Sequence, residues 1–224
     1  QGTPGTSNDL FILRFDPTCD LKWSTYYGGN NSDIGVDGGM ITDVSGNLYI
    51  VGETRSTNFP VQNLSGAYNQ PAKASGGCCA DGYILKFDTA GVRKWATYYN
   101  GNNSTSGLWA VAADRNNNIY ATGYTMATNF PLQNLSGAYN QSTNAGGFSD
   151  IMVMKFDSLG TLKWSTYYGG NSADLGYEII TNKSDSQMIY VAGETTSSNF
   201  PSQDPGNGSY FDNSLSGGGT YYDV

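Results

Sequence analysis

Pairs of adjacent tyrosines recur at three places in the chain, and their residue type and spacing suit contact with a ligand. A tyrosine ring combines a flat apolar face with a polar hydroxyl, so a sugar ring can stack on it. The same amphipathic ring also packs well between β-sheets, and both interpretations stay open at this point. The pairs are Tyr26 and Tyr27, Tyr98 and Tyr99, and Tyr167 and Tyr168.

A second candidate site is rich in side-chain oxygens, which are the ligands that calcium takes. It follows the first tyrosine pair, and the third tyrosine pair is followed by a partial copy. The spacing does not match an EF-hand loop, so an ordinary polar turn is the alternative to a structural calcium ion. We expect no other cofactor. The residues are Asn30, Asn31, Ser32, Asp33 and Asp37, with Asn171 and Asp174 in the third copy.

Acid–base chemistry has few residues to draw on. The chain contains no histidine, which removes the usual general base, the usual catalytic triad and a common zinc or haem ligand. Its glutamates are Glu53, Glu178 and Glu194, and the first and last occupy equivalent repeat positions. A hydrolase that uses Glu53 or Asp33 is the least favoured hypothesis. We therefore expect no enzymatic activity.

Charge and composition limit the classes of partner and of secondary structure that this chain can have. Eleven basic and nineteen acidic residues give a net charge of −8, which repels nucleic acid and anionic lipid. No apolar run reaches the roughly 18 residues needed to span a bilayer, so we expect no membrane span. Thirty glycines, seventeen tyrosines and only 13% charged residues favour strands and turns over helices.

The three cysteines are Cys19, Cys78 and Cys79, and their spacing forms no redox or zinc motif. A disulfide from Cys19 to either of the other two is one interpretation and suits an oxidising compartment. Free thiols are the other.

The chain repeats with a period of about seventy residues, which is typical of repeat architectures. Within each repeat, turn residues separate four short strands, and a loop of about 25 residues leads to the next repeat. We predict that each repeat unit is one blade, at 1–80 with its long connecting loop, 81–149 and 150–222, with 223–224 opening a further repeat. The most regular markers are Trp23, Trp95 and Trp164, and the sequence Asn-Phe-Pro at 58–60, 129–131 and 199–201.

Apolar residues occupy both faces of the expected strands, so each sheet must be covered on both sides. Four-stranded units that recur at this interval predict an all-β fold, a β-propeller of antiparallel blades, of which three are present in a larger propeller. A β-solenoid is the alternative. Recurring glycines indicate a crowded strand where other atoms approach the backbone closely. They are Gly52, Gly123 and Gly193.

Most basic residues lie in one type of hairpin. We expect them to pair with the aspartates of the same hairpins rather than to form a ring that binds a ligand. The basic residues are Arg14, Lys86 and Lys155 with Lys22, Lys94 and Lys163, and the aspartates are Asp16, Asp88 and Asp157.

Three motifs recur in order: Leu-Lys-Trp-Ser-Thr-Tyr-Tyr-Gly-Gly at 21–29, Gly-Asn-x-Tyr-x-x-Gly-x-Thr at 46–54, and Asn-Phe-Pro. In these residues the chain resembles the seven-bladed beta-propeller repeat family, which is widespread in secreted bacterial proteins, often of Bacteroidetes. The resemblance implies the propeller fold over nearly the whole chain and carries no catalytic residue across. The second copy departs from the pattern, with Asn100 for the first glycine and Tyr124 where the others have Glu53 and Glu194.

We expect a secreted or cell-surface scaffold or adhesion module that contacts proteins or glycans through its Asn-Phe-Pro loops and tyrosines. A carbohydrate-binding propeller attached to an enzyme is the alternative. We also expect the chain to contact further blades of the same chain or copies of itself. Thr89 and Ser158 also resemble the acceptors of Bacteroidetes O-glycosylation.

Overall fold

The computed structural model describes residues 7–77, 79–182 and 188–215, and the described residues form strands, turns and loops without a helix. None of these elements is a helix that could cross a membrane. The strands are β1 (Leu10–Phe15), β2 (Leu21–Tyr27), β3 (Asp33–Thr42), β4 (Leu48–Thr54), β5 (Asp81–Phe87), β6 (Arg93–Tyr99), β7 (Ser106–Ala113), β8 (Ile119–Thr125), β9 (Asp150–Phe156), β10 (Leu162–Tyr168), β11 (Asp174–Thr181) and β12 (Ile189–Thr195).

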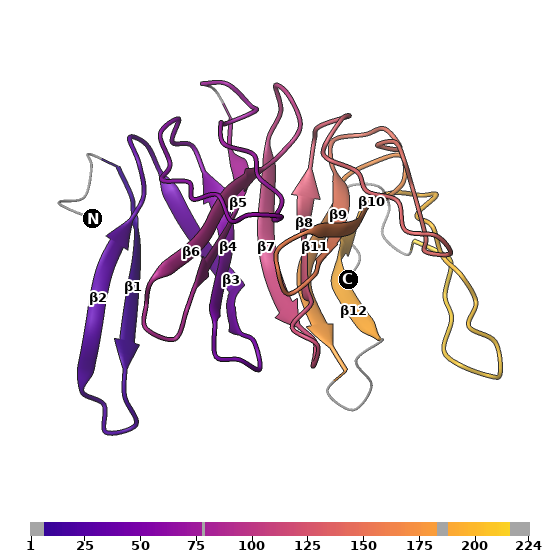
Figure 1. Cartoon of the computed structure of the whole chain (residues 1–224). Coiled ribbons are helices and arrows are strands. Elements are labelled where there is room, and N and C mark those ends of the chain that lie inside the picture. Colours follow the sequence, from indigo (N-terminus) through magenta and orange to yellow (C-terminus); the bar gives the residue numbers. More distant parts are fainter. Residues whose placement is uncertain (1–6, 78, 183–187, 216–224) are drawn as a thin grey trace.

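The strands form antiparallel sheets that are β-propeller blades. Two sheets are complete, with strand orders β3-β4-β5-β6 and β7-β8-β9-β10, and two are pairs, β1-β2 and β11-β12. Figure 1 shows β1-β2 at one side of the molecule, β3 to β6 beside it, and β7 to β12 together at the other side. The first strands of successive sheets, β3, β7 and β11, lie against one another. The fold is thus the all-β propeller architecture that the repeat predicts.

The sheets are offset by half a repeat from the sequence units. Repeat unit 1–80 contributes β1-β2 to one sheet and β3-β4 to the next, and the units 81–149 and 150–222 are divided in the same way. The reason is the pairing of β4 with β5, which runs without interruption from Leu48 opposite Phe87 to Thr54 opposite Asp81. The boundaries of the repeats are therefore not the boundaries of the blades. The unit 223–224 lies outside the described residues.

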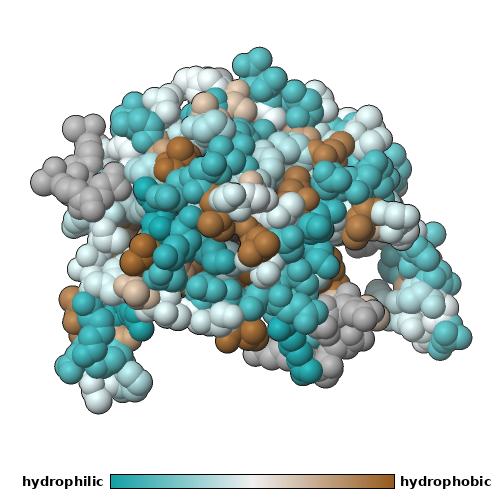
Figure 2. Space-filling view, viewed as in Figure 1, coloured by the Kyte–Doolittle hydropathy of each residue, from teal (hydrophilic) through white to brown (hydrophobic). Residues whose placement is uncertain are grey.

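The apolar core lies between the sheets. One cluster joins β3-β4-β5-β6 to β7-β8-β9-β10, and smaller clusters fill the interfaces with the two strand pairs. On the face seen in Figure 2, apolar residues form small separated groups among polar ones. The strands are thus apolar on both faces because each complete sheet has a neighbour on each side.

The phenylalanines of the Asn-Phe-Pro loops belong to this core, while the expected role of these loops as contact surfaces stays a prediction. Phe59 and Phe130 are buried at the interfaces between sheets. The loops also pair with outer strands, with Gln62 opposite Ala96 in β6 and Gln133 opposite Ser165 in β10. They therefore cover strand edges that would otherwise be open to aggregation.

The recurring glycines occupy crowded positions, as predicted. A Cβ atom on Gly123 would lie 1.9 Å from the carbonyl oxygen of Gly107, and one on Gly52 would lie 2.2 Å from that of Ile34. Gly193 meets Leu175 in the same way. Any side chain at these positions would collide with the neighbouring strand.

Candidate functional site

Most of the paired tyrosines are packed in the core, which favours the packing interpretation over that of sugar-binding platforms. Tyr27, Tyr98, Tyr99 and Tyr167 are buried in the core. Burial raises the pKa of each of their hydroxyls, that of Tyr27 to about 12. Tyrosine rings that are packed between sheets have no face left for a sugar. Tyr168 is half-buried, and only Tyr26 of the six is clearly exposed, at 46%.

The second tyrosine of each pair connects two neighbouring sheets. The hydroxyl of Tyr99 in β6 donates a hydrogen bond of 2.6 Å to the carbonyl oxygen of Pro131, which follows β8 of the next sheet. Tyr27 donates to Pro60 and Tyr168 to Pro201 in the same way. The tyrosine pair and the Asn-Phe-Pro motif therefore recur together because they form one interaction between blades.

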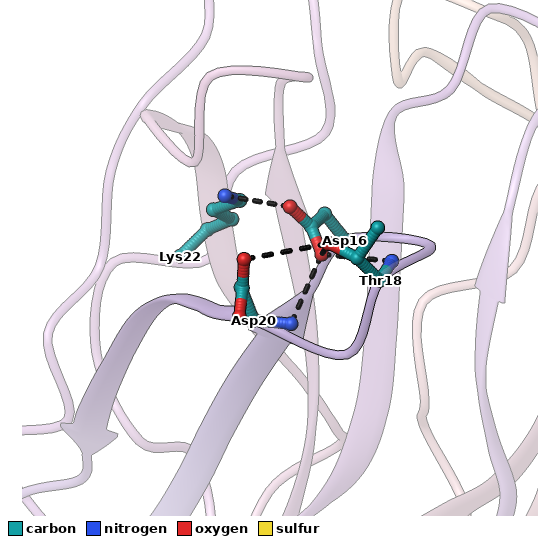
Figure 3. A network of polar contacts seen from close by, with 4 residues as sticks. All are labelled: Asp16, Thr18, Asp20 and Lys22. Atoms are coloured by element: carbon teal, nitrogen blue, oxygen red, sulfur yellow. Dashed lines mark hydrogen bonds and ion pairs between the residues drawn. The ribbon is translucent and has the colours of Figure 1, made fainter.

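The hairpin turns carry the ion pairs expected for one set of basic residues. Lys22 pairs with Asp16 at 2.6 Å, and Figure 3 shows Asp16 also accepting from Thr18 and from the backbone amide of Asp20. The Lys22 ammonium and the Thr18 hydroxyl lower the pKa of Asp16 to about 2. The matching pairs are Lys94 with Asp88 and Lys163 with Asp157.

Two of the other basic residues reach the next hairpin instead. Lys86 donates to the carbonyl oxygen of Ser158 at 3.1 Å, and Arg14 donates to that of Thr89. The expected pairing of Arg14 and Lys86 with aspartates is therefore replaced by contacts between successive blades. The side chains of Thr89 and Ser158 are exposed at these turns, and their O-glycosylation stays a prediction.

Cys19 has an exposed thiol that is not in a disulfide. It adopts a left-handed φ of 65° at the turn position where the other copies have Gly91 and Gly160, at 80° and 82°. Cys79 is half-buried, and Cys78 lies outside the described residues. The structure therefore gives Cys19 a turn position rather than the disulfide considered from the sequence.

The candidate calcium residues after the first tyrosine pair hold two loops together. Asn30 bonds through its side chain to Thr57, and the backbone amide of Asn31 donates to Ser56 at 2.9 Å. Asp33 is buried and accepts from the hydroxyls of Thr54 and Ser56. The side chain of Asp37 is not among those described.

The structure also brings together an aromatic cluster that sequence reasoning missed. Trp109 in β7 and Tyr177 in β11 stack with ring centroids 5.2 Å apart and planes 16° apart. Each is the extra residue of a β-bulge, since the register of its strand shifts at that position. A bulge redirects a side chain and is frequent at functional sites. Here equivalent bulges on neighbouring inner strands turn two aromatic rings toward each other.

Carboxylates border this stack. The indole nitrogen of Trp109 donates to Glu53 at 2.7 Å, and the hydroxyl of Tyr177 donates to Glu194 at 2.9 Å. Gly107 makes room for the first contact, because a Cβ there would lie 2.1 Å from the carboxylate oxygen of Glu53. The two glutamates thus fix the edges of the rings.

Tyr124 completes the cluster, with its ring 4.7 Å from that of Trp109. Burial and the neighbouring Glu53 carboxylate raise the pKa of Tyr124. We refer to Trp109, Tyr124, Tyr177, Glu53 and Glu194 as the aromatic–carboxylate cluster. Exposed aromatic rings beside carboxylates can bind a sugar, since an open ring face contacts its C–H groups and the carboxylates accept from its hydroxyls, and Tyr177 is 38% exposed.

Two signals in the sequence could have indicated this cluster. Trp109 is the one tryptophan of four that does not recur with the repeat, and Tyr124 departs from the glutamate of the other copies. A residue that differs from its equivalents in the other repeats is not needed for the contacts that all repeats share. It can therefore contribute to a site that occurs in one repeat. What the sequence could not show is that both lie beside Tyr177.

Comparisons with known proteins agree with this architecture. A family described as Beta-propeller repeat matches residues 22–60. The chain is also 25% identical over 197 residues to a protein described as "Uncharacterized WD repeat-containing protein L264" of Acanthamoeba polyphaga mimivirus. That similarity covers 83% of this chain and 14% of the viral protein, so the chain spans about one seventh of that relative's length. Together with the sheets, the match defines a β-propeller repeat protein.

Proposed function

We propose that this protein is a non-enzymatic scaffold or adhesion module, secreted or at the cell surface, that works through contacts between its propeller blades and further blades or copies of itself. The observation that carries the proposal is the complementarity between β1-β2 at one end of the molecule and the outer strands β9-β10 at the other. One end presents an aromatic side chain, and the other presents the pocket that receives this side chain inside the molecule.

The internal interface shows how such a contact is built. Phe156 is fully buried and packs on Trp95, with ring centroids 5.5 Å apart, and on Tyr99 at 6.0 Å. The turn after Phe156 is held as well, because the backbone amide of Tyr68 donates to the carbonyl oxygen of Gly160 at 2.8 Å. Each blade thus inserts a phenylalanine and its turn into the previous blade.

The same receiving surface lies open at the β9-β10 side of the molecule. Trp164 and Tyr139 correspond to Trp95 and Tyr68, and each indole donates to the carbonyl of its tyrosine partner, at 2.9 Å and 2.8 Å. They line a cavity of about 810 Å³ together with Tyr168, Phe200 and Tyr210, among others. This cavity has the residues of a blade interface that lacks its phenylalanine.

The opposite end carries the matching insert. Phe15 in β1 is the counterpart of Phe87 and Phe156, which are buried, yet it is 54% exposed. The indole nitrogen of Trp23 is buried and has no hydrogen-bond partner among the described residues, whereas its copies at Trp95 and Trp164 have one. A buried donor without an acceptor is costly, so this end also favours a covering partner. Ends that differ but fit each other give head-to-tail association.

Sedimentation of the purified chain tests this proposal. We expect assembly that increases with concentration and that is lost in Phe15→Ser and in Trp164→Ala, with Val44→Ser as a control at an exposed position away from both ends. A mixture of the two variants should form dimers and nothing larger, because each keeps one intact end. A wild-type chain that stays monomeric at every concentration would contradict the proposal.

A glycan-binding propeller is the second candidate function, and the aromatic–carboxylate cluster favours it. Binding on a glycan array should fall about 5- to 150-fold in Trp109→Ala, since the loss of one stacking contact between an aromatic side chain and a nucleic-acid base costs about 1–3 kcal/mol. Tyr26→Ala serves as the comparison, because Tyr26 is exposed on the outer hairpin. Loss of binding in Tyr26→Ala alone would place the sugar at the hairpin, and no binding at all would reject this candidate.

A further inference from the structure

Two buried aspartates face the same small space at the start of β9 and β11. Asp150 and Asp174 are both fully buried. A Cβ atom added to Gly169 would lie 2.7 Å from Oδ2 of Asp174 and 3.1 Å from Oδ1 of Asp150, so both oxygens border the position beside this glycine. Gly169 therefore lets both acids approach one point, where a side chain would collide with them.

The hydrogen bonds around these acids leave one oxygen without a partner. Oδ2 of Asp150 accepts from the backbone amide of Ala145 and from Gln141, at 2.9 Å and 3.0 Å. Oδ1 of Asp150 is buried and has no hydrogen-bond partner among the described residues. Asp174 is satisfied by the hydroxyls of Thr195 and Ser197, which stabilise a negative charge. Burial and the Asp174 charge raise the pKa of Asp150 to about 6.

In the middle repeat, a side-chain amide donates to the equivalent buried acid. Asn100 stands there at the position of Gly169, and Asp81 is the counterpart of Asp150. The Nδ2 of Asn100 donates to Oδ1 of Asp81 at 3.0 Å. The same nitrogen donates to the carbonyl oxygens of Ala80 and Ser104, at 3.3 Å and 2.7 Å. One electropositive group is thus surrounded by three oxygens.

The amide oxygen of Asn100 replaces the second acid. It accepts from the backbone amide of Gly101 at 2.7 Å and from the hydroxyl of Ser106. Oδ2 of Asp174 does the same for Gly170 at 2.7 Å and for Ser197. Three positions change together between the repeats: Gly169, Asp174 and Ser197 become Asn100, Ser106 and Ala127.

We propose that Asp150 and Asp174 bind a calcium ion in the space beside Gly169 that the Asn100 amide nitrogen fills in the middle repeat. The carbonyl groups of Ser149 and Ser172, which correspond to Ala80 and Ser104, are the further ligands. Two carboxylates with main-chain carbonyls form the oxygen-only set that calcium prefers. A cation there compensates two buried charges that would otherwise repel each other.

The first repeat has a similar arrangement, with Asp9 half-buried, and gives a second site. A Cβ on Gly28 would lie 2.4 Å from Oδ1 of Asp9 and 2.7 Å from Oδ2 of Asp33. Asp33 is bonded to Thr54 and Ser56, as Asp174 is to Thr195 and Ser197. We therefore expect two calcium ions for each chain, in the first and third repeats.

The middle repeat supplies a matched variant for the test. A triple variant of the third repeat combines Gly169→Asn, Asp174→Ser and Ser197→Ala. Each new residue is the one that the middle repeat has at the equivalent position, so this fold already accepts it. Calorimetric titration of the chelator-treated full chain with calcium chloride should give two equivalents, and the triple variant should give one. The reverse triple variant, Asn100→Gly, Ser106→Asp and Ala127→Ser, should give three.

Thermal unfolding provides a second readout. Calcium should raise the midpoint for the wild-type chain, because a ligand that binds only the folded state stabilises it, and less so in the triple variant. The proposal is overturned if no calcium binds at about 1 mM, the weak end for extracellular calcium modules. It is equally overturned if the triple variant still binds two equivalents, since the ions would then be held by the acidic surface.

Discussion

The hydroxyl of Tyr99 lies 2.6 Å from the carbonyl oxygen of Pro131 and donates a hydrogen bond to it across the boundary between two blades. The ring of Tyr99 also packs 6.1 Å from that of Phe130, centroid to centroid. Tyr27 and Phe59 repeat this contact at 5.2 Å. The Asn-Phe-Pro motif therefore contacts a tyrosine of the preceding blade, and this interaction couples each sheet to the next.

Removal of that hydroxyl should weaken the coupling. Tyr99→Phe keeps the ring and leaves the Pro131 carbonyl without its donor, so we expect the free energy of unfolding to fall by about 1–2 kcal/mol. Urea denaturation measures this change. Tyr26→Phe is the control, since Tyr26 is exposed, and it should change stability by less than about 0.5 kcal/mol. Equal effects of the two variants would contradict a coupling role for Tyr99.

Tryptophans at equivalent positions should differ in their contribution to stability. Trp95 is fully buried against Phe156, whereas Trp164 is half-buried at the open interface. Trp95→Ala should cost about 3–5 kcal/mol, and Trp164→Ala should cost clearly less in the monomer. Denaturation at low protein concentration measures both. If Trp164→Ala costs as much as Trp95→Ala, the pocket around Trp164 is already filled.

The ion pair of the first hairpin should be visible in the acid range. Its Asp16 has a folded pKa of about 2, below the ordinary 3.8, so its contribution to stability is fully present above pH 3.8 and is lost as the pH falls through about 2. Lys22→Met should move the Asp16 pKa upward, and the bonds from Thr18 and Asp20 should hold it below 3.8. Carboxyl NMR titration measures both values. An unchanged pKa in the variant would show that Lys22 has no influence.

A methyl group at a crowded glycine should strongly lower the free energy of unfolding. Gly123→Ala places a Cβ 1.9 Å from the carbonyl oxygen of Gly107, and because that atom belongs to the backbone, the strands must move apart. We expect a loss of at least about 2 kcal/mol. Gly77→Ala is the matched control, because nothing lies within 4 Å of its Cβ position. Thermal and urea unfolding compare the two, and similar midpoints would contradict the close approach.

Local features of the fold were open to prediction from single residues. The turn at Asp16 and its copies, the hairpins that carry Trp23, Trp95 and Trp164, and the glycines of the inner crowded strands all follow from short-range pattern and repeat. The candidate site was not predictable in this way. Trp109 and Tyr177 are 68 residues apart and meet only because bulges on two different strands redirect them.

The amino-acid sequence alone determined the strand units, their repetition and the need for cover on both faces, because alternating apolar residues and turn residues act over a few neighbours. The tertiary structure decided which half-repeats share a sheet, which tyrosines are buried, and where Asn100 substitutes for a second acid. Those outcomes depend on which strand lies beside which and on the space left between them. Such distances arise only when blades pack on one another, and no local pattern encodes them.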